Sequence, residues 1–213
     1  MAHVLARKRL AAPERREQVL AVAMGLFARR GFSGTTTREI AEAAGVSEAL
    51  LFRLFPDKES LYAAIIQHKI DASCEDHLPE DAARRGDDRE VLRHLGLGLL
   101  ERMKSDPSFT RLLLHSGMEG HALADMFYRL RMRSTLKFLE DYLRRRVNAR
   151  ALRRVDPALV ARTFFGTICN HALMRELFEA ERKSRISDEA FVDSIVDIML
   201  NGMVPSGPRR RPR

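Results

Sequence analysis

Polar side chains suited to nucleic-acid recognition are concentrated in one short stretch of the sequence, residues 35–56. Thr37 and Ser47 supply hydroxyl groups, Glu48 supplies a carboxylate and Arg53 supplies a guanidinium group. A guanidinium group can bond both O6 and N7 of guanine, and a hydroxyl group can cap a helix by accepting from a free backbone N–H. These residue types predict recognition of DNA rather than the making or breaking of covalent bonds.

The histidine and cysteine residues do not form a catalytic or metal-binding pattern. Cys169 and His171 are two positions apart, so they would face different sides of a helix. His115 and His121 flank a glycine-containing bend, and two histidines alone are weak evidence for a metal ion. The sequence contains no nucleophile elbow, phosphate loop or metalloprotease motif. We therefore expect no enzyme activity, no metal site and no cofactor.

Two short helices joined by a tight turn are expected to position the polar residues. The first runs roughly from residue 38 to 44, with Thr37 as its N-cap and Gly45 as its end. The second runs from about residue 48 to 54, with Ser47 as its N-cap and a proline just past its end. This arrangement predicts a helix-turn-helix, whose second helix enters the DNA major groove.

Helical periodicity continues along the rest of the chain, and no convincing β pattern occurs, which predicts an all-α fold. Residues 76–89 are polar and read as a loop or frayed segment. We expect a helix at about 89–104, where Gly96 and Gly98 would allow close helix packing, and a long helix at about 123–149. The arginines from Arg144 to Arg154 read as a solvated face rather than a second nucleic-acid site.

The last two expected helices, from residue 156 to about 182 and from residue 187 onward, are apolar over more than one face. A helix that is hydrophobic on every side must be buried on every side. We therefore expect these helices to meet a second subunit in a symmetric homodimer. The expected interface residues are Phe165, Cys169, Phe191, Ile195, Ile198 and Met199.

The bulk properties agree with a DNA-binding protein without requiring one. The formal net charge of +8 and the pI near 10.1 favour a polyanionic partner, with a charged, solvated surface as the alternative. Cys74 and Cys169 read as reduced, buried thiols. No signal peptide or bilayer-spanning run is evident, so we expect a soluble, cytoplasmic protein without membrane association.

The block from Arg15 to Ile66 resembles the TetR family of bacterial transcriptional regulators. The features that match in order and spacing are the LFARRGF junction, the TTTREIA opening, the AGVS turn, FRLFPDKE and the apolar helix after it. The resemblance implies an obligate dimer that binds a near-palindromic operator in double-stranded DNA. It also implies a small-molecule effector pocket in the C-terminal domain, and most family members are repressors that an inducer releases from DNA.

The residue pattern along the chain also predicts a division into five parts. The expected parts are a flexible basic arm at 1–12, a helix-turn-helix DNA-binding domain at 13–57, a connecting helix at 58–75, a regulatory and dimerisation domain at 76–203 and a basic disordered tail at 204–213. The arm could reach phosphates or a minor groove, or it could be a solvated tail.

The family motif carries over to eight residues expected to bind DNA: Thr37, Arg38, Ser47, Glu48, Ala49, Phe52, Arg53 and Lys58. Glu48 stands where the family often has lysine, and it could accept from cytosine N4 or simply favour the helix N-terminus. Phe52 replaces the commoner tyrosine and lacks the phosphate-binding hydroxyl. Arg53 is the best candidate for reading guanine, with a phosphate contact as the alternative. Leu50 lies between the two faces of the helix.

The effector pocket is expected to be lined by bulky apolar side chains of the C-terminal region. The candidates are Phe109, Leu113, Met118, Phe127, Met132, Phe164, Phe165, Ile168, His171 and Met174. Each of these residues could instead belong to plain core or to the dimer interface. As a set they suit an apolar or aromatic effector, with Asn170, His171 and Arg175 as polar anchors. The alternative is a helix-turn-helix regulator controlled by a protein partner or by no effector.

Overall fold

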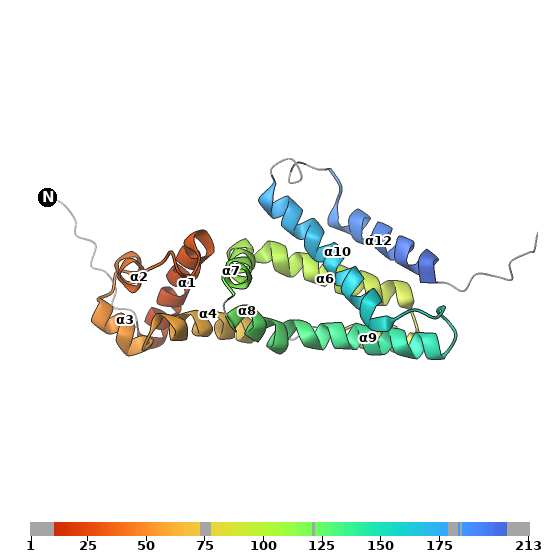
Figure 1. Cartoon of the computed structure of the whole chain (residues 1–213), viewed down its shortest axis with the longest axis horizontal. Coiled ribbons are helices and arrows are strands. Elements are labelled where there is room, and N and C mark those ends of the chain that lie inside the picture. Colours follow the sequence, from red (N-terminus) through yellow and green to blue (C-terminus); the bar gives the residue numbers. More distant parts are fainter. Residues whose placement is uncertain (1–10, 73–77, 121, 179–182, 184, 204–213) are drawn as a thin grey trace, which may run out of the picture. The chain divides into compact units, whose positions relative to one another are not determined.

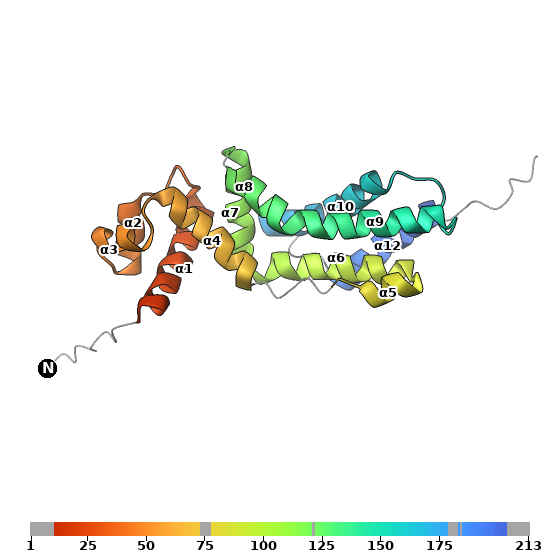
Figure 2. The same ribbon diagram turned by 90° about the horizontal axis from the view of Figure 1, so that it is seen from below.

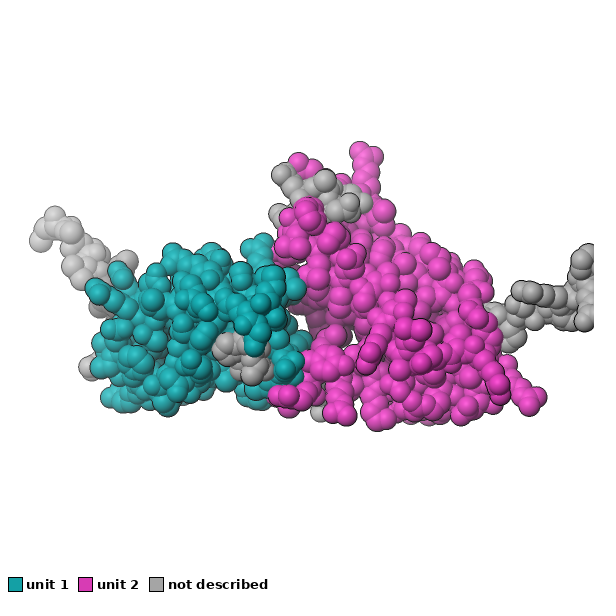
Figure 3. Space-filling view, in the orientation of Figure 1, with its two compact units in different colours: residues 1–74, 108–127 teal, residues 75–107, 128–213 magenta. Residues whose placement is uncertain are grey.

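The computed structural model describes residues 11–72, 78–120, 122–178, 183 and 185–203. Every regular element within these ranges is a helix, which confirms the all-α prediction (Figure 1). The chain divides into two compact units (Figure 3). Unit 1 comprises residues 1–74 and 108–127, and unit 2 comprises residues 75–107 and 128–213. Cys74, most of the N-terminal arm and the whole C-terminal tail lie outside the described residues.

Unit 1 contains the predicted helix-turn-helix and two helices from later in the chain. Its helices are α1 (Ala12–Arg30), α2 (Thr37–Ala44), α3 (Glu48–Leu54), α4 (Lys58–Ala72), α7 (Pro107–Met118, from its second residue) and α8 (Ala122–Phe127). Their shared core includes Val19, Ile40, Leu51, Ile65 and Leu112, all almost fully buried. The inclusion of α7 and α8 is not indicated by the sequence pattern, because it depends on packing between distant segments.

An aromatic cluster lies between α1 and α4 in unit 1. The ring of Phe27 meets the ring of Tyr62 edge-on, with 4.8 Å between the ring centroids. Phe32, which follows α1, packs 5.8 Å from Phe27 and 5.2 Å from Tyr62. Phe27 and Tyr62 are fully buried, and such pairs add to the stabilisation from burial. The cluster therefore anchors the turn after α1 to the helix that begins after the DNA-binding motif.

Unit 2 is a helical bundle in which α6 packs against two later helices. Its elements are α5 (Glu80–Arg85), α6 (Asp88–Ser105), the π-helix η1 (Tyr128–Met132), α9 (Arg133–Asn148), α10 (Pro157–Leu177) and α12 (Asp188–Met203). α6 contacts α10 and α12, α10 also contacts α9, and α5 lies beside the start of α6 (Figure 2). The core includes Leu92, Leu139, Phe164, Ile168 and Val192, all almost fully buried.

One sequence prediction about these helices was wrong. Residues 76–89 do not form only a loop, because α5 occupies Glu80–Arg85 and Gly86 ends it in the left-handed conformation, with φ of 70°. The long helix expected at about 123–149 is present as α8, η1 and α9 in succession, but its middle segment is a π-helix that was not predicted. A π-turn adds one residue to the hydrogen-bonded ring, and residue periodicity alone does not reveal it.

Ion pairs link α6 to α12 in antiparallel register. Arg89 pairs with Asp197, Arg93 Nε lies 3.0 Å from Asp193 Oδ1, and Lys104 Nζ lies 2.5 Å from Asp188 Oδ2. Most of these side chains are partly exposed, so each pair contributes little to stability. The matched four-residue spacing of Arg89 and Arg93 on α6 and of Asp193 and Asp197 on α12 instead favours one alignment of the two helices over its neighbours.

The basic end of α9 is partly used within the chain. Arg146 donates to Asp88 from Nε at 2.8 Å and from Nη2 at 2.9 Å, and the Tyr142 hydroxyl donates to the same carboxylate at 2.6 Å. Arg144 pairs with Glu140 and Asp141 on its own helix. Arg146 therefore links α9 to α6, whereas the Arg144 pairs lie within α9.

The two glycines within α6 differ in their surroundings. A Cβ atom added at Gly96 would lie 2.9 Å from Val192 Cγ1 and 3.2 Å from Phe164 Cζ. At Gly98 the nearest atom would be Arg102 Nη1, the end of a flexible side chain, at 3.4 Å. Close packing, which the sequence predicted for both glycines, is therefore required only at Gly96, where α10 and α12 both approach.

We expect Gly96→Ala to leave the protein less stable than Gly98→Ala. The gain in helix propensity, about 1 kcal/mol, is common to both substitutions and cancels in the comparison. The remaining difference reports overpacking at Gly96, which costs about 1–3 kcal/mol. Urea unfolding of both variants at one protein concentration measures it. Equal free energies of unfolding would contradict the close packing of α6.

Candidate nucleic-acid interface

The helix-turn-helix begins with a capping box at Thr36 and Glu39. Thr36 Oγ1 accepts from the Glu39 amide at 3.2 Å, and Glu39 Oε2 accepts from the Thr36 amide at 2.9 Å. Hydrogen bonds that the Glu39 carboxylate accepts from the Thr36 amide and the Thr36 hydroxyl hold the pKa of Glu39 below its usual value. The prediction that Thr37 is the N-cap was therefore wrong by one residue. Only Thr36 stands three positions before a glutamate, which is the spacing that a capping box requires.

The turn and the start of α3 are built as the sequence predicts. Gly45 ends α2 in the left-handed conformation, with φ of 63°. Ser47 Oγ accepts from the Leu50 amide at 3.2 Å and so caps α3. Because these contacts lie within a few residues of each other, local sequence is sufficient to specify them.

Helix α3 has one buried face and one exposed face. Leu51 is 1% exposed and Phe55, just after the helix, is 3% exposed, so both belong to the core of unit 1. On the other face Ala49, Phe52 and Arg53 are exposed, with 44% of Phe52 accessible to solvent. Leu50 is half-buried between the two faces. The sequence predicted this division, because helical spacing alone separates the two sets.

The acidic residue at the start of α3 faces α2. Thr37 Oγ1 lies 3.5 Å from Glu48 Oε1, a distance at the limit of hydrogen bonding. A carboxylate in the first turn also suits the positive end of the α3 dipole. This geometry agrees with the helix-terminus interpretation of Glu48 rather than with a side chain directed only at bases.

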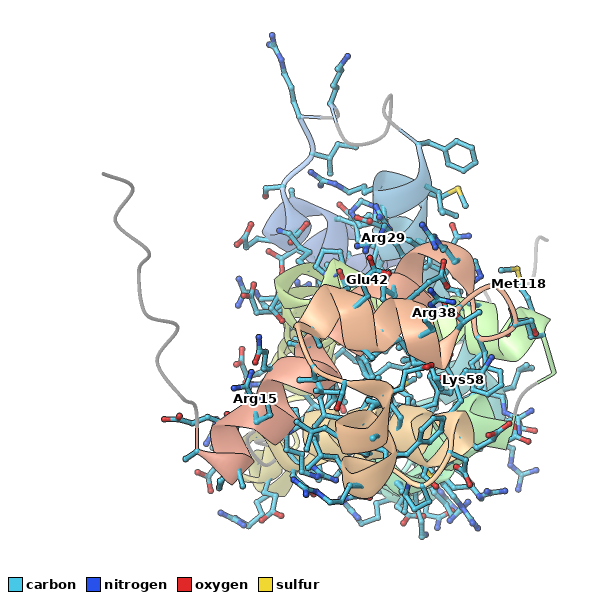
Figure 4. All side chains as sticks on the ribbon, turned by 90° about the vertical axis from the view of Figure 1, so that its left-hand side faces the viewer. Arg15, Arg29, Arg38, Glu42, Lys58 and Met118 are labelled. Carbon is cyan, nitrogen blue, oxygen red and sulfur yellow. The ribbon has the colours of Figure 1, made fainter. Side chains whose placement is uncertain are left out.

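Arg38 and Lys58, two of the residues predicted to bind DNA, have different surroundings (Figure 4). The Arg38 side chain is exposed at the first turn of α2. Lys58 Nζ instead donates to the backbone oxygens of Phe32 at 2.9 Å and Thr35 at 3.0 Å, and it lies 4.1 Å from the centre of the Phe32 ring. An ammonium group has three N–H donors, so these bonds leave one for a phosphate oxygen. Lys58 therefore also holds the turn between α1 and α2.

Glu119, the residue after α7, also holds this turn, and the sequence analysis did not predict it. Glu119 Oε2 accepts from the Phe32 amide at 3.1 Å. Gly31, next to it, has φ of 70°, and a Cβ there would lie 2.3 Å from Glu119 Oε1. Thr35 is buried and donates from Oγ1 to the Gly31 oxygen at 2.9 Å. No local pattern points to Glu119, because 87 positions separate it from Phe32.

A hydrogen bond between α4 and α7 accompanies the Glu119 contact. The Tyr62 hydroxyl donates to the Leu112 backbone oxygen at 3.2 Å. Burial raises the pKa of Tyr62 to about 12, so the phenol keeps its proton at physiological pH. Together these bonds attach α7 both to α4 and to the turn after α1.

The ten predicted pocket residues are divided between the two units. In unit 1, Phe109 and Phe127 meet edge-on with 5.4 Å between ring centroids, Leu113 packs against the core and Met118 is 76% exposed. The other six belong to unit 2: Met132, Phe164, Phe165, Ile168, His171 and Met174. Of these, Phe164, Phe165 and Ile168 are almost fully buried in its core.

The predicted dimer residues also differ in exposure. Phe165 is 4% exposed, so other side chains of the same chain already cover it. Ile198 is 67% exposed on α12, whereas Cys169, Phe191, Ile195 and Met199 are half-buried. The ring of Phe191 stacks on His171 with 3.7 Å between centroids. Burial raises the pKa of the Cys169 thiol, which keeps it protonated.

Neither a metal centre nor a membrane span appears in the described part of the chain. No group of three or more histidine, cysteine, aspartate or glutamate side chains there could hold a metal ion. None of the helices described is long and apolar enough to cross a bilayer.

Comparison with known proteins matches both parts of the chain. Residues 19–65 match the bacterial regulatory proteins of the tetR family, and residues 90–202 match the AefR-like transcriptional repressor C-terminal domain. The nucleoid occlusion factor SlmA of Haemophilus influenzae is 29% identical over 174 residues, which are 76% of this chain and 75% of SlmA.

Solved structures share the fold. The TetR family regulator PfmR from Thermus thermophilus superposes with a TM-score of 0.65 at 23% identity, covering 86% of this chain and 97% of PfmR. Apo AibR gives a TM-score of 0.59 at 28% identity, covering 87% and 98%. AibR in complex with isovaleryl coenzyme A and operator DNA gives 0.62 at 24% identity, with the same coverage.

We expect Lys58→Met to lower the free energy of unfolding, because it removes two hydrogen bonds from an ammonium group to the turn. Such bonds contribute about 1.5–3 kcal/mol when buried, and partial exposure reduces the expected loss to roughly 1–2 kcal/mol. Arg38→Met is the matched control, since Arg38 is exposed and should change stability by less than about 0.5 kcal/mol. Chemical denaturation measures both, and equal effects would show that Lys58 does not hold the turn.

Proposed function

Because the chain belongs to the TetR family of bacterial transcriptional regulators, we propose that it is a dimeric repressor of the cytoplasm that binds a near-palindromic operator. A small, largely apolar effector bound in the C-terminal region would release it. Its role is binding and not catalysis. The observation that carries the proposal is the capped helix-turn-helix, whose α3 places Arg53 on the face opposite its buried residues.

DNA binding would combine two kinds of contact. Arg38, Thr37 and the remaining N–H of Lys58 would contact phosphates, which gives sequence-independent affinity that falls as salt rises. Arg53 would supply specificity through the two acceptors of guanine. Ser47, Glu48 and Ala49 stand at the start of the same helix and would fix its approach to the groove.

The proposed homodimer would use the outward sides of α10 and α12. Leu159 on α10 is 64% exposed and Ile198 on α12 is 67% exposed. Both helices pack on α6 with their other sides, so their exposed sides remain for a partner. Pairing across a two-fold axis would bury these apolar side chains and present two recognition helices to two operator half-sites.

An effector would act by preferring one arrangement of the two reading heads over the other. The AibR structure with isovaleryl coenzyme A and operator DNA supports a ligand that carries an apolar acyl group. The aromatic and aliphatic side chains of α10 in unit 2 suit such a group. The ligand class that we propose is therefore a small molecule with a substantial apolar part.

A protein partner is the second candidate for control, and the likeness to SlmA favours it. That relative is a nucleoid occlusion factor, and it matches three quarters of this chain. Genomic footprinting separates control by a small molecule from control by a protein partner. A repressor that responds to a small molecule should occupy a few promoters, near genes whose products act on that molecule. Sites scattered over the chromosome without promoters would favour the SlmA-like role.

We expect Arg53→Ala to weaken binding to the footprinted operator by about 1–3 kcal/mol and to leave binding to random DNA nearly unchanged. Fluorescence anisotropy on both DNAs at fixed salt measures this. Arg38→Ala is the control, because loss of a phosphate contact should weaken binding to both DNAs alike. An equal loss for Arg53→Ala on operator and random DNA would refute its base-reading role.

We also expect the protein to sediment as a dimer at micromolar concentration and Ile198→Asp to produce monomers, because the substitution places a charge in a buried apolar interface. Ile186→Asp is the matched control, since Ile186 is 54% exposed but lies before α12, not on it. Analytical ultracentrifugation of the wild type and both variants measures their oligomeric state. A wild-type monomer would contradict the proposed interface.

A further inference from the structure

The exposed face of α3 carries an apolar patch, formed by Ala49 and Phe52, beside Arg53. Ala49 and Phe52 are three positions apart and therefore share one side of the helix. The core of unit 1 uses Leu51 and Phe55 instead, which are 1% and 3% exposed. Phe52 is 44% exposed. The fold thus leaves an aromatic side chain in water on the side of the helix that carries Arg53.

The patch contains no hydrogen-bonding side chain that could read a base by donor and acceptor pattern. Glu48, on the same helix, has its carboxylate near the Thr37 hydroxyl. Arg53 is the remaining exposed polar side chain at the middle of α3. Readout by the patch must therefore be apolar. In the major groove the C5-methyl group of thymine is the apolar feature that distinguishes one base from the others.

We propose that Ala49 and Phe52 determine specificity by contacting thymine methyl groups beside the guanine that Arg53 reads. This inference rests on the proposed DNA-binding function and deepens it by naming the base that the apolar side of α3 selects. Half-buried Leu50, placed between the faces, contributes less surface than Phe52. The chemistry predicts an operator half-site in which thymines adjoin a guanine.

The charge around the patch favours DNA as its occupant. Arg38 and Arg53 are exposed on α2 and α3, and Lys58 begins α4 in the same unit. These cations would attract the phosphates on either side of the groove. An apolar protein surface would gain nothing from them, whereas a base edge between two phosphate strands meets both the cations and the apolar patch.

The test replaces thymine by uracil at each position of the footprinted operator, which removes only the methyl group. For the wild-type protein we expect uracil at one or two positions per half-site to weaken binding about fourfold each, the effect of burying one apolar carbon group. Phe52→Ala should bind the thymine operator as weakly as the wild type binds the uracil operator, with no further loss on uracil. Fluorescence anisotropy at fixed salt measures all four combinations.

One control variant and one stability measurement keep the result interpretable. Phe52→Tyr retains the ring and should remain sensitive to uracil. Phe52→Ala should keep the wild-type unfolding free energy within about 0.5 kcal/mol, because the side chain is partly exposed. If Phe52→Ala loses affinity equally on both operators, the ring packs on the sugar–phosphate backbone and the proposal is overturned.

The outcomes also separate this inference from the proposed function. Specific operator binding that is indifferent to uracil at every position would overturn the methyl contact and leave the regulator intact. A wild-type protein that binds operator and random DNA alike would overturn the proposed function itself.

Discussion

A helix of seven residues such as α3 is not stable alone in water, and its anchoring to unit 1 is the constraint on which DNA reading depends. Leu51 and Phe55 supply that anchor by burial, while Ser47 satisfies a backbone donor at the start of the helix. With the inner face fixed, the outer face, which carries Arg53, has a defined direction. The reading surface is therefore a consequence of packing beneath it.

The turn between α1 and α2 connects this head to the rest of unit 1. Lys58 binds two of its carbonyl oxygens and Glu119 binds the Phe32 amide, so opposite charges hold neighbouring backbone groups of one turn. Charged partners make stronger hydrogen bonds than neutral ones. Because Glu119 directly follows α7, a displacement of α7 would also move the turn. The hydrogen bond from Tyr62 to Leu112 would in addition couple α7 to α4.

Unit 2 is held together differently from unit 1. Its helices approach closely at Gly96, and exposed ion pairs join α6 to α12. Gly96 lets α10 and α12 approach α6, and the pairs from α6 to α12 align the helices around it. With the inner sides of α10 and α12 committed to α6, their apolar outer residues Leu159 and Ile198 remain at the surface. Proposed dimerisation therefore depends on the same packing that completes the bundle.

Local sequence was enough to predict the all-α class, the helix-turn-helix and the two faces of α3, because caps, left-handed glycines and helical spacing act within a few residues. The sequence also contained the signal for Thr36 as the cap, in Glu39 three residues later. Contacts between distant segments required the fold: Glu119 at the α1–α2 turn, and the difference between Gly96 and Gly98. Two glycines two positions apart have the same local sequence character, and only the neighbouring helices make one of them indispensable.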